Sequence, residues 1–221
     1  MTRAVLLDAL GTLVELQPPA PRLRALLAEA GFEVSEEQAA AGFGAEIGYY
    51  VQHHLEGGDR ERLDLLRDRC AEALRAGLGL PELDHATARR VMLGALEFRA
   101  FPDIEPALRE LRAAGARLVI ASNWDCSLPD WLGPAGVLDL VDGVVSSAEL
   151  GEAKPAPAVF LRALELAGAG PDEAVHVGDS LENDVEGARA AGIRPLLLVR
   201  GGEAPAGVEV IRSLAELPSI V

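Results

Sequence analysis

Short apolar runs recur along the chain and are bounded by turn-forming residues. Five of them have the length and composition of buried strands, at residues 3–7, 117–121, 142–147, 174–179 and 195–199. Helical patterns with an acidic or prolyl start and a glycine at the end lie between them, at residues 103–115, 157–168 and 181–192. Strands that alternate with helices predict an α/β fold with a parallel sheet covered by helices on both faces.

The pattern changes between residues 16 and 100. Apolar residues there recur at three- and four-residue intervals, which predicts amphipathic helices at 20–31, 36–56, 60–78 and 85–98. Four helices in a row have no place in an alternating sheet. We therefore expect residues 16–100 to form a helical cap inserted into a core of residues 1–15 and 101–221. Prolines near both junctions, at residues 15–19 and 99–103, favour hinges there.

Length, charge and cysteine content narrow the class of protein. A chain of 221 residues suffices for one core with a smaller insert, and it contains no apolar run of 18 residues that would span a bilayer. The first strand begins almost at the N-terminus, which leaves no room for a signal peptide. A net charge of −15 argues against nucleic acid as a partner. We expect a cytoplasmic monomer or homodimer with two reduced cysteines and no membrane association.

Polar residues stand where the predicted strands end. Asp8 follows the first strand, Ser122 and Asn123 follow the second, and Lys154 follows the third. Asp179 ends the fourth, with Asp184 in the helical segment beyond it. In an open parallel sheet, ligands bind beyond the carboxyl ends of the strands, so these side chains should meet at one rim.

The residue types at this rim favour phosphoryl transfer. Asp8 and Asp179 are hard oxygen ligands suited to Mg²⁺, which takes one or two carboxylates together with water and phosphate oxygens. Lys154 is the only lysine among 20 basic residues, and a compact ammonium can approach an anion closely. Ser122 and Asn123 stand at a predicted helix start, where phosphate oxygens bind well. Asp8 would attack phosphorus and form an aspartyl phosphate.

Several other interpretations are weaker. Taken singly, Asp8, Ser122 and Asp184 are also typical turn or helix-capping residues, and only their convergence on one rim favours a functional site. The four histidines have no metal-ligand spacing and are interpreted as structural or solvated, and the Cys126 thiol as inert. Motifs of the P-loop, the dinucleotide-binding loop and the nucleophile elbow are absent from the sequence.

Four short motifs, in this order, resemble those of the haloacid dehalogenase-like (HAD) hydrolases. They are DALGTL from residue 8, SN at 122–123, KPAP at 154–157 and GDSLEND at 178–184, and with the helical insert they cover essentially the whole chain. The resemblance implies a Rossmann-like core, a cap of the first type and an Asp8 nucleophile. It also implies Ser122 and Lys154 on phosphate, and Mg²⁺ held by Asp8, Asp179 and the Leu10 carbonyl. Asp184 would orient Lys154 or a metal-bound water.

Leu10 departs from the pattern of the phosphatases in this superfamily. They generally carry a second Asp at that position, which protonates the leaving group and then activates water. Loss of such a group typically costs about 10²–10⁴ in rate. Either good leaving groups need no proton, or the cap supplies an acid on closure. By sequence position, the acids considered are Glu15, Tyr49, Tyr50 and His53. Tyr49, Tyr50, His53 and Trp124 are also predicted to contact the substrate.

Two alternative functions stay open at this stage. Dehalogenases of the superfamily lack the second Asp too, but they carry Tyr there, work without a metal and lack the pair that stands here as Gly178 and Asp179. Retention of the metal-binding Asp therefore favours a Mg²⁺-dependent phosphatase acting on a small phosphate ester. A binding protein without catalytic activity is the other alternative, which Leu10 favours and the intact Asp8, Lys154 and Asp179 disfavour.

Overall fold

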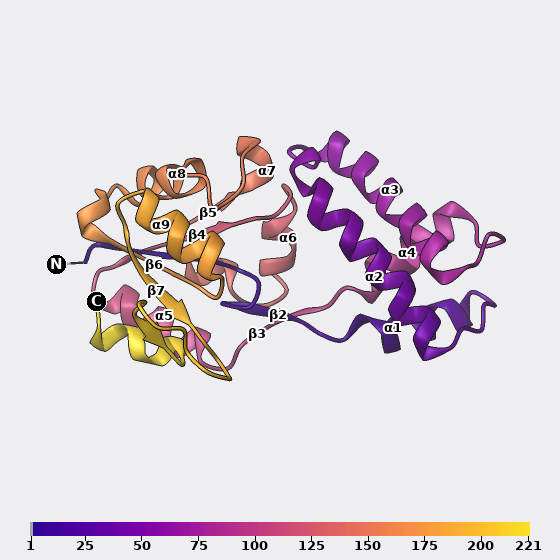
Figure 1. Ribbon diagram of the computed structural model, residues 1–221, viewed down its shortest axis with the longest axis horizontal. Helices are drawn as coiled ribbons and strands as arrows, with labels where there is room; N and C mark the ends of the chain where they lie inside the picture. The colour runs from indigo at the N-terminus through magenta and orange to yellow at the C-terminus, as the bar shows by residue number, and fades with distance from the viewer. Residues whose placement is uncertain (1) are drawn as a thin grey trace.

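The computed structural model describes residues 2–221, and over these residues six strands form one parallel sheet (Figure 1). The strand order is β5-β4-β1-β6-β7-β8, with β1 in the interior between β4 and β6. The bounds are Ala4–Leu7 for β1, Arg117–Ser122 for β4, Gly143–Ser146 for β5, Ala174–Gly178 for β6, Arg194–Leu198 for β7 and Val210–Ile211 for β8. The parallel α/β, Rossmann-like sheet predicted from the sequence is confirmed.

Alternating side chains of each strand enter two separate apolar layers. Val5 and Leu7 of β1 pack with α5 (Ile104–Ala113) and the 3₁₀-helix Leu214–Ser219 on one face. Ala4 and Leu6 face the opposite layer, with α8 (Ala158–Ala167) and α9 (Gly187–Ala190). Because both faces are covered, the strands are mainly apolar on both sides, which is the pattern that the sequence carries.

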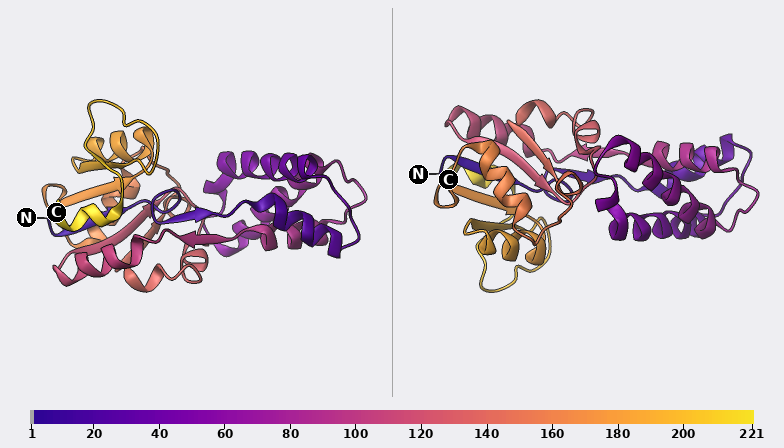
Figure 2. Two further views of the ribbon diagram at one scale, coloured as in Figure 1. Left: turned by 90° about the horizontal axis from the view of Figure 1, so that it is seen from below. Right: turned by 90° about the horizontal axis from the view of Figure 1, so that it is seen from above.

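Between β2 and β3 the chain forms a bundle of α1 (Pro19–Glu29), α2 (Glu36–His53), α3 (Arg60–Leu78) and α4 (His85–Ala95) with an apolar core of its own. It stands where the sequence predicts a cap, and we refer to this bundle as the cap. Asp59 and Asp84 cap α3 and α4 by accepting hydrogen bonds from the backbone N–H groups of Arg62 and Thr87. The bundle extends away from the core lobe on the side where the carboxyl end of β1 lies (Figures 1 and 2).

A short antiparallel ribbon joins the two lobes. It consists of β2 (Val14–Leu16) and β3 (Phe98–Ala100), at the junctions where the sequence predicted hinges. The helix expected at residues 85–98 therefore ends at Ala95, because Leu96 adopts an extended backbone that leads into β3. Behind the ribbon, Arg200 donates hydrogen bonds to the Asp103 carboxylate and the Thr12 carbonyl, which holds both crossings against the core.

Other differences from the expected elements are local. The helix expected at 181–192 begins as a π-helical turn, Leu181–Glu186, before α9. The helix expected at 36–56 ends as a 3₁₀ turn, His54–Glu56. The elements α6 (Leu128–Leu132), α7 (Ser147–Leu150) and β8, and the 3₁₀ turns Leu138–Leu140 and Pro171–Glu173, are too short to give a periodic pattern. Within residues 2–221, the structure has no helix both long and apolar enough to cross a membrane.

Candidate active site

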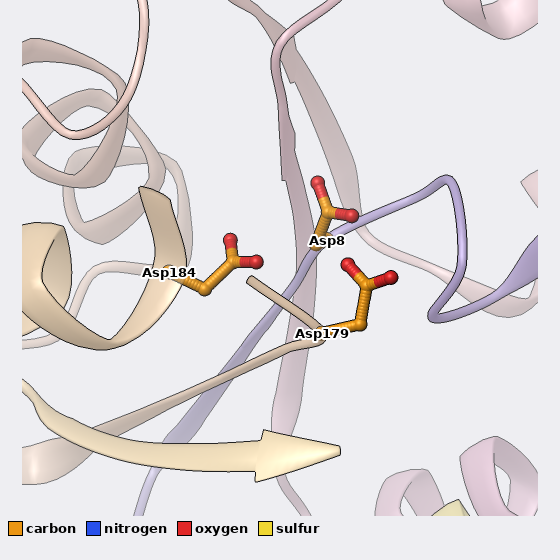
Figure 3. Close-up of side chains that lie close together, drawn as sticks. All are labelled: Asp8, Asp179 and Asp184. Carbon is orange, nitrogen blue, oxygen red and sulfur yellow. The ribbon is translucent and has the colours of Figure 1, made fainter. Parts of the chain in front are cut away.

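The predicted residues of the rim meet at the carboxyl end of the sheet. Asp8 follows β1, Ser122 ends β4, and Asp179 follows β6. The three carboxyl groups of Asp8, Asp179 and Asp184 converge from separate segments of the core (Figure 3). On one side of β1 lie β4 and β5, and on the other side lie β6, β7 and β8. The strand order therefore reverses at β1, and the site lies at this topological switch point, where open α/β sheets bind ligands.

Asp8 lies at the centre of a buried hydrogen-bonded group. The residue is 7% exposed, and its Oδ1 accepts a hydrogen bond from the Ser122 hydroxyl at 3.0 Å. The Lys154 ammonium donates to the same oxygen at 2.7 Å and to Asp184 Oδ1 at 2.6 Å. One cation thus links two buried carboxylates, and both the hydroxyl and the ammonium contact Asp8 Oδ1.

Two further groups of the core hold the Asp184 carboxylate in place. Its Oδ2 accepts a hydrogen bond from the Ser180 N–H at 3.0 Å, and its Oδ1 lies 3.0 Å from His176 Nε2. His176 projects from β6 and is fully buried, so it is a structural histidine and not a solvated one. Its contact with Asp184 was missed by sequence reasoning, and a polar residue inside an apolar strand was the only available signal.

Asn123 holds the lysine loop. Its amide nitrogen donates to the Lys154 carbonyl at 2.9 Å, and its amide oxygen accepts from the Lys154 N–H at 2.7 Å. Both polar atoms of this side chain are therefore engaged with the backbone of Lys154. The sequence predicted that Asn123 binds phosphate directly. The structure gives its side chain a positioning role, and the phosphate contact stays a prediction.

Burial and neighbouring charges shift the pKa values of the ionisable groups in the cluster. Burial and the neighbouring Asp184 charge raise the pKa of Asp8, although Lys154 acts in the opposite direction. Burial opposes ionisation of Asp184 as well, but Lys154 and His176 hold its pKa below the usual range. Burial would lower the pKa of Lys154, yet Asp8 and Asp184 raise it, so the ammonium stays charged. Burial, Asp8 and Asp184 raise the pKa of Asp179 to about 6.

The donor set fits a hard divalent cation. Carboxylate oxygens of Asp8, Asp179 and Asp184 all lie within 4.8 Å of one another, and a cation between them would offset the repulsion that raises the Asp179 pKa. Two glycines make room for the cluster. A Cβ at Gly11 would lie 2.1 Å from Asp179 Oδ2, and a Cβ at Gly178 would lie 2.1 Å from Asp184 Cγ. The Leu10 carbonyl stays a predicted ligand.

Two adjoining cavities meet at Leu10. One, of about 270 Å³, is lined by the rim residues Asp8, Ser122, Lys154, Asp179 and Asp184. The other, of about 310 Å³, lies between the cap and the core and has a mainly apolar lining. Leu10, Asn123 and Asn183 line both, and Leu10 is 45% exposed. The leucine side chain therefore stands at the passage between the rim and the second cavity, which we call the cap chamber.

The residues predicted to contact the substrate divide into two groups. Tyr50 and Trp124 line the cap chamber, where the Tyr50 hydroxyl donates to Asp125 Oδ2 at 2.9 Å. Tyr49 and His53 stack on each other with ring centroids 4.2 Å apart, and among the described residues that line the two cavities neither appears. Glu15 lies on β2 and accepts a hydrogen bond from Gln17. Sequence reasoning missed Glu46, Asp125 and Trp131, which all line the chamber.

Comparison with known proteins identifies the class. Residues 2–192 match the haloacid dehalogenase-like hydrolase family, and the chain belongs to it. It is 42% identical over 95 residues to haloacid dehalogenase-like hydrolase domain-containing protein 3 of Homo sapiens, covering 43% of this chain and 38% of that protein. It is 32% identical over 213 residues to a glyceraldehyde 3-phosphate phosphatase of Methanopyrus kandleri, covering 91% of this chain and 85% of that protein.

Solved structures extend the comparison to the whole fold. A HAD phosphatase from Thermococcus onnurineus superposes with a TM-score of 0.68 at 26% identity, covering 99% of this chain and 97% of that one. A 2-haloacid dehalogenase from Pseudomonas syringae gives a TM-score of 0.71 at 24% identity, covering 100% and 98%. The second likeness concerns the fold alone. The chain is thus a HAD hydrolase with relatives named as phosphatases.

Proposed function

We propose that this protein is a Mg²⁺-dependent phosphatase that hydrolyses a small phosphate monoester through an aspartyl phosphate on Asp8. The observation that carries the proposal is the position of Asp8, whose Oδ1 contacts both the Ser122 hydroxyl and the Lys154 ammonium. Asp179 and Asp184 place two further carboxylates beside it. Relatives named as phosphatases, including the Methanopyrus kandleri protein, add support.

The residues of the chain account for both halves of the reaction. The Ser122 hydroxyl and the Lys154 ammonium would donate to phosphate oxygens, which positions phosphorus against the Asp8 carboxylate. Asp8 attacks, its new bond to phosphorus forms, and the bond to the leaving-group oxygen breaks. Water then attacks phosphorus, the bond to Asp8 breaks, and phosphate leaves with the proton lost by the water. Lys154 stays charged throughout because Asp184 remains beside it.

Asp8, Asp179 and the Leu10 carbonyl would hold the metal, with Asp184 next to them. A bound Mg²⁺ would supply positive charge close to the transferred phosphoryl group and hold its oxygens in place. That charge would also favour the ionised form of Asp8, whose pKa burial raises in the protein alone. The Asp8 carboxylate is then available as a nucleophile at neutral pH.

Leu10 sets the expected range of substrates. Its side chain offers no proton to the leaving group, and it occupies the passage where an acid would be useful. Esters whose leaving group is stable as an anion, such as aryl phosphates, should therefore react faster than alkyl phosphates. The lining of the cap chamber would then decide among esters of similar reactivity.

The direct test measures hydrolysis of 4-nitrophenyl phosphate with Mg²⁺ and after its removal by a chelator. We expect turnover only with the metal, and a loss of about 10⁴-fold or more in Asp8→Asn. Trapping of phosphate on the wild-type chain but not on the variant would establish the intermediate. Release of halide from 2-haloacids without metal would replace this proposal by a dehalogenase. Turnover on neither substrate class would favour a binding protein that retains the fold.

A further inference from the structure

The cap chamber contains one buried acid among apolar side chains. Glu46 projects from α2 and is only 6% exposed, while Leu63, Leu66, Met92 and other apolar residues line the same cavity. A leucine or an alanine would fill such a place in a helical bundle without the cost of burying a carboxyl. The presence of an acid there requires a reason beyond packing.

Glu46 lacks a charged partner in the protein. Among residues 2–221, no ion pair or hydrogen bond to nitrogen or oxygen involves its side chain, and the Cys70 thiol beside it is a weak donor. Arg67 also lines the chamber but forms no ion pair with Glu46. Burial accordingly raises the pKa of Glu46 to about 7. The cation of a bound ligand could therefore pair with this carboxylate without displacing a cation of the protein.

The position of Glu46 along α2 separates it from the reacting atoms. Tyr50 lies four residues later in the helix and reaches Asp125 of the core through its hydroxyl. The C-terminal end of α2 leads to a 3₁₀ turn that lies against α7 of the core. Glu46 is therefore about one helical turn, or ~5 Å, further from the core than Tyr50. It therefore lines the part of the cap chamber that is further from the core.

We propose that Glu46 is a specificity-determining residue that binds an ammonium group at the far end of an apolar leaving group. The substrate class is then a phosphate monoester of an amino alcohol or an aminoalkyl-substituted phenol, with the phosphate at Asp8 and the amine in the cap chamber. The inference rests on the proposed function for the chemistry at Asp8. Recognition in the chamber is nevertheless measurable without turnover.

The kinetic test uses three phenyl phosphates that carry a 4-aminomethyl, 4-(2-aminoethyl) or 4-(3-aminopropyl) group. Each is compared with the alkyl analogue in which methyl replaces the ammonium. We expect at least one amine to exceed its analogue about tenfold in kcat/KM, and Glu46→Gln to reduce that ratio to within about twofold of unity. Glu37→Gln, an exposed change in the same helix, should leave the preference unchanged.

A binding test separates this inference from the proposed function. Calorimetry with the free phenols, tyramine against 4-propylphenol for the middle pair, requires no hydrolysis. Preference for the amine that is lost in Glu46→Gln supports the inference even if no phosphate ester is hydrolysed. Hydrolysis with no preference for any amine overturns the inference and leaves the phosphatase proposal standing. A preference that persists in Glu46→Gln also overturns it.

Discussion

Buried carboxylates have a cationic partner at the rim of the core, whereas the buried carboxyl in the cap chamber has none among the described residues. At the rim, Lys154 bridges Asp8 and Asp184, so each of these buried charges has a partner within 2.7 Å. In the chamber, Glu46 is buried without a cation, and its pKa is raised to about 7. At the rim the buried carboxylates of Asp8 and Asp184 share a cation of the protein itself, whereas residues 2–221 provide no cation that pairs with Glu46 in the chamber. Our two proposals therefore assign chemistry to the rim and substrate discrimination to the cap chamber.

The two regions also differ in how they are held. The rim residues stand on strands and on turns fixed by Asn123, Ser180 and His176. The shape of the chamber depends on the β2–β3 ribbon, which connects the lobes, and on a few contacts between them. Among these contacts are the ion pair of Arg60 with Asp130 and the Tyr50–Asp125 hydrogen bond. A change in cap position would therefore alter the chamber and leave the rim geometry intact.

The largest effect on stability is expected from removing Lys154, the cation that pairs with Asp8 and Asp184 at the rim. Lys154→Met leaves Asp8 and Asp184 buried without a cation, which should reduce the free energy of unfolding by about 3–5 kcal/mol at neutral pH. It should also reduce kcat/KM by about 10²–10³-fold, because a donor to the phosphate is lost. Urea unfolding and steady-state kinetics measure the two effects.

Lys154→Arg serves as the matched variant. It retains the positive charge but not the compact ammonium, so stability should recover more fully than activity. Stability of Lys154→Met within about 1 kcal/mol of the wild type would contradict the compensation described for the rim.

The core of the molecule was well predicted from the sequence because its signals are local and repeated. Apolar strands covered on both faces give continuous runs, and the residue after each run occupies the rim of a parallel sheet by topology alone. That is why Asp8, Ser122 and Asp179 could be identified together before any contact was known. The fold of the core follows from the same reasoning.

What the sequence could not give depends on contacts between distant residues. Glu46 lies in a helix with ordinary amphipathic spacing, and the packing of α2 against α3, with residues of α4 and of the core opposite, places Glu46 on the wall of a cavity. His176 and Asn123 acquire their roles through partners in other segments. The β2–β3 ribbon pairs residues more than eighty positions apart, so neither three-residue strand carries a signal of its own.

The next largest effect tests the uncompensated charge in the chamber. Because burial raises the folded-state pKa of Glu46 to about 7, ionising it destabilises the fold as pH rises from its unfolded value of 4.5 toward 7. Relative to Glu46→Gln, the wild type should therefore lose about 2–3 kcal/mol between pH 5 and pH 8. Urea unfolding of both proteins at the two pH values measures the difference, and other titrating groups cancel.

A pH-independent difference between the wild type and Glu46→Gln would mean that the carboxyl is already paired in the free protein. Glu37→Gln, on the exposed side of the same helix, should follow the wild type at both pH values.

The passage between the two regions gives a third prediction. Leu10→Asp places a carboxyl where both cavities meet, and the 45% exposure of Leu10 should allow this without unfolding. We expect turnover of an alkyl phosphate to rise about 10–100-fold, and that of 4-nitrophenyl phosphate much less, because only the alkoxide needs a proton. The ratio of the two kcat/KM values is the measurement.

Leu10→Asn is the matched control, because it has the same size and no ionisable proton. An unchanged ratio in Leu10→Asp would contradict the assignment of Leu10 to the position of the missing acid.

The smallest effect concerns the contact that closes the chamber. Tyr50→Phe removes the hydroxyl that donates to Asp125 Oδ2 at 2.9 Å, while the ring stays in place. We expect the contact between cap and core to become about 1 kcal/mol less favourable. This should appear as an increase of about fivefold in KM with little change in kcat. Tyr49→Phe is the matched control, since Tyr49 stacks on His53 and is absent from the described lining of both cavities. Equal effects of the two substitutions would mean that closure does not depend on this hydrogen bond, because of the two tyrosines Tyr50 is the one whose hydroxyl donates to the core residue Asp125.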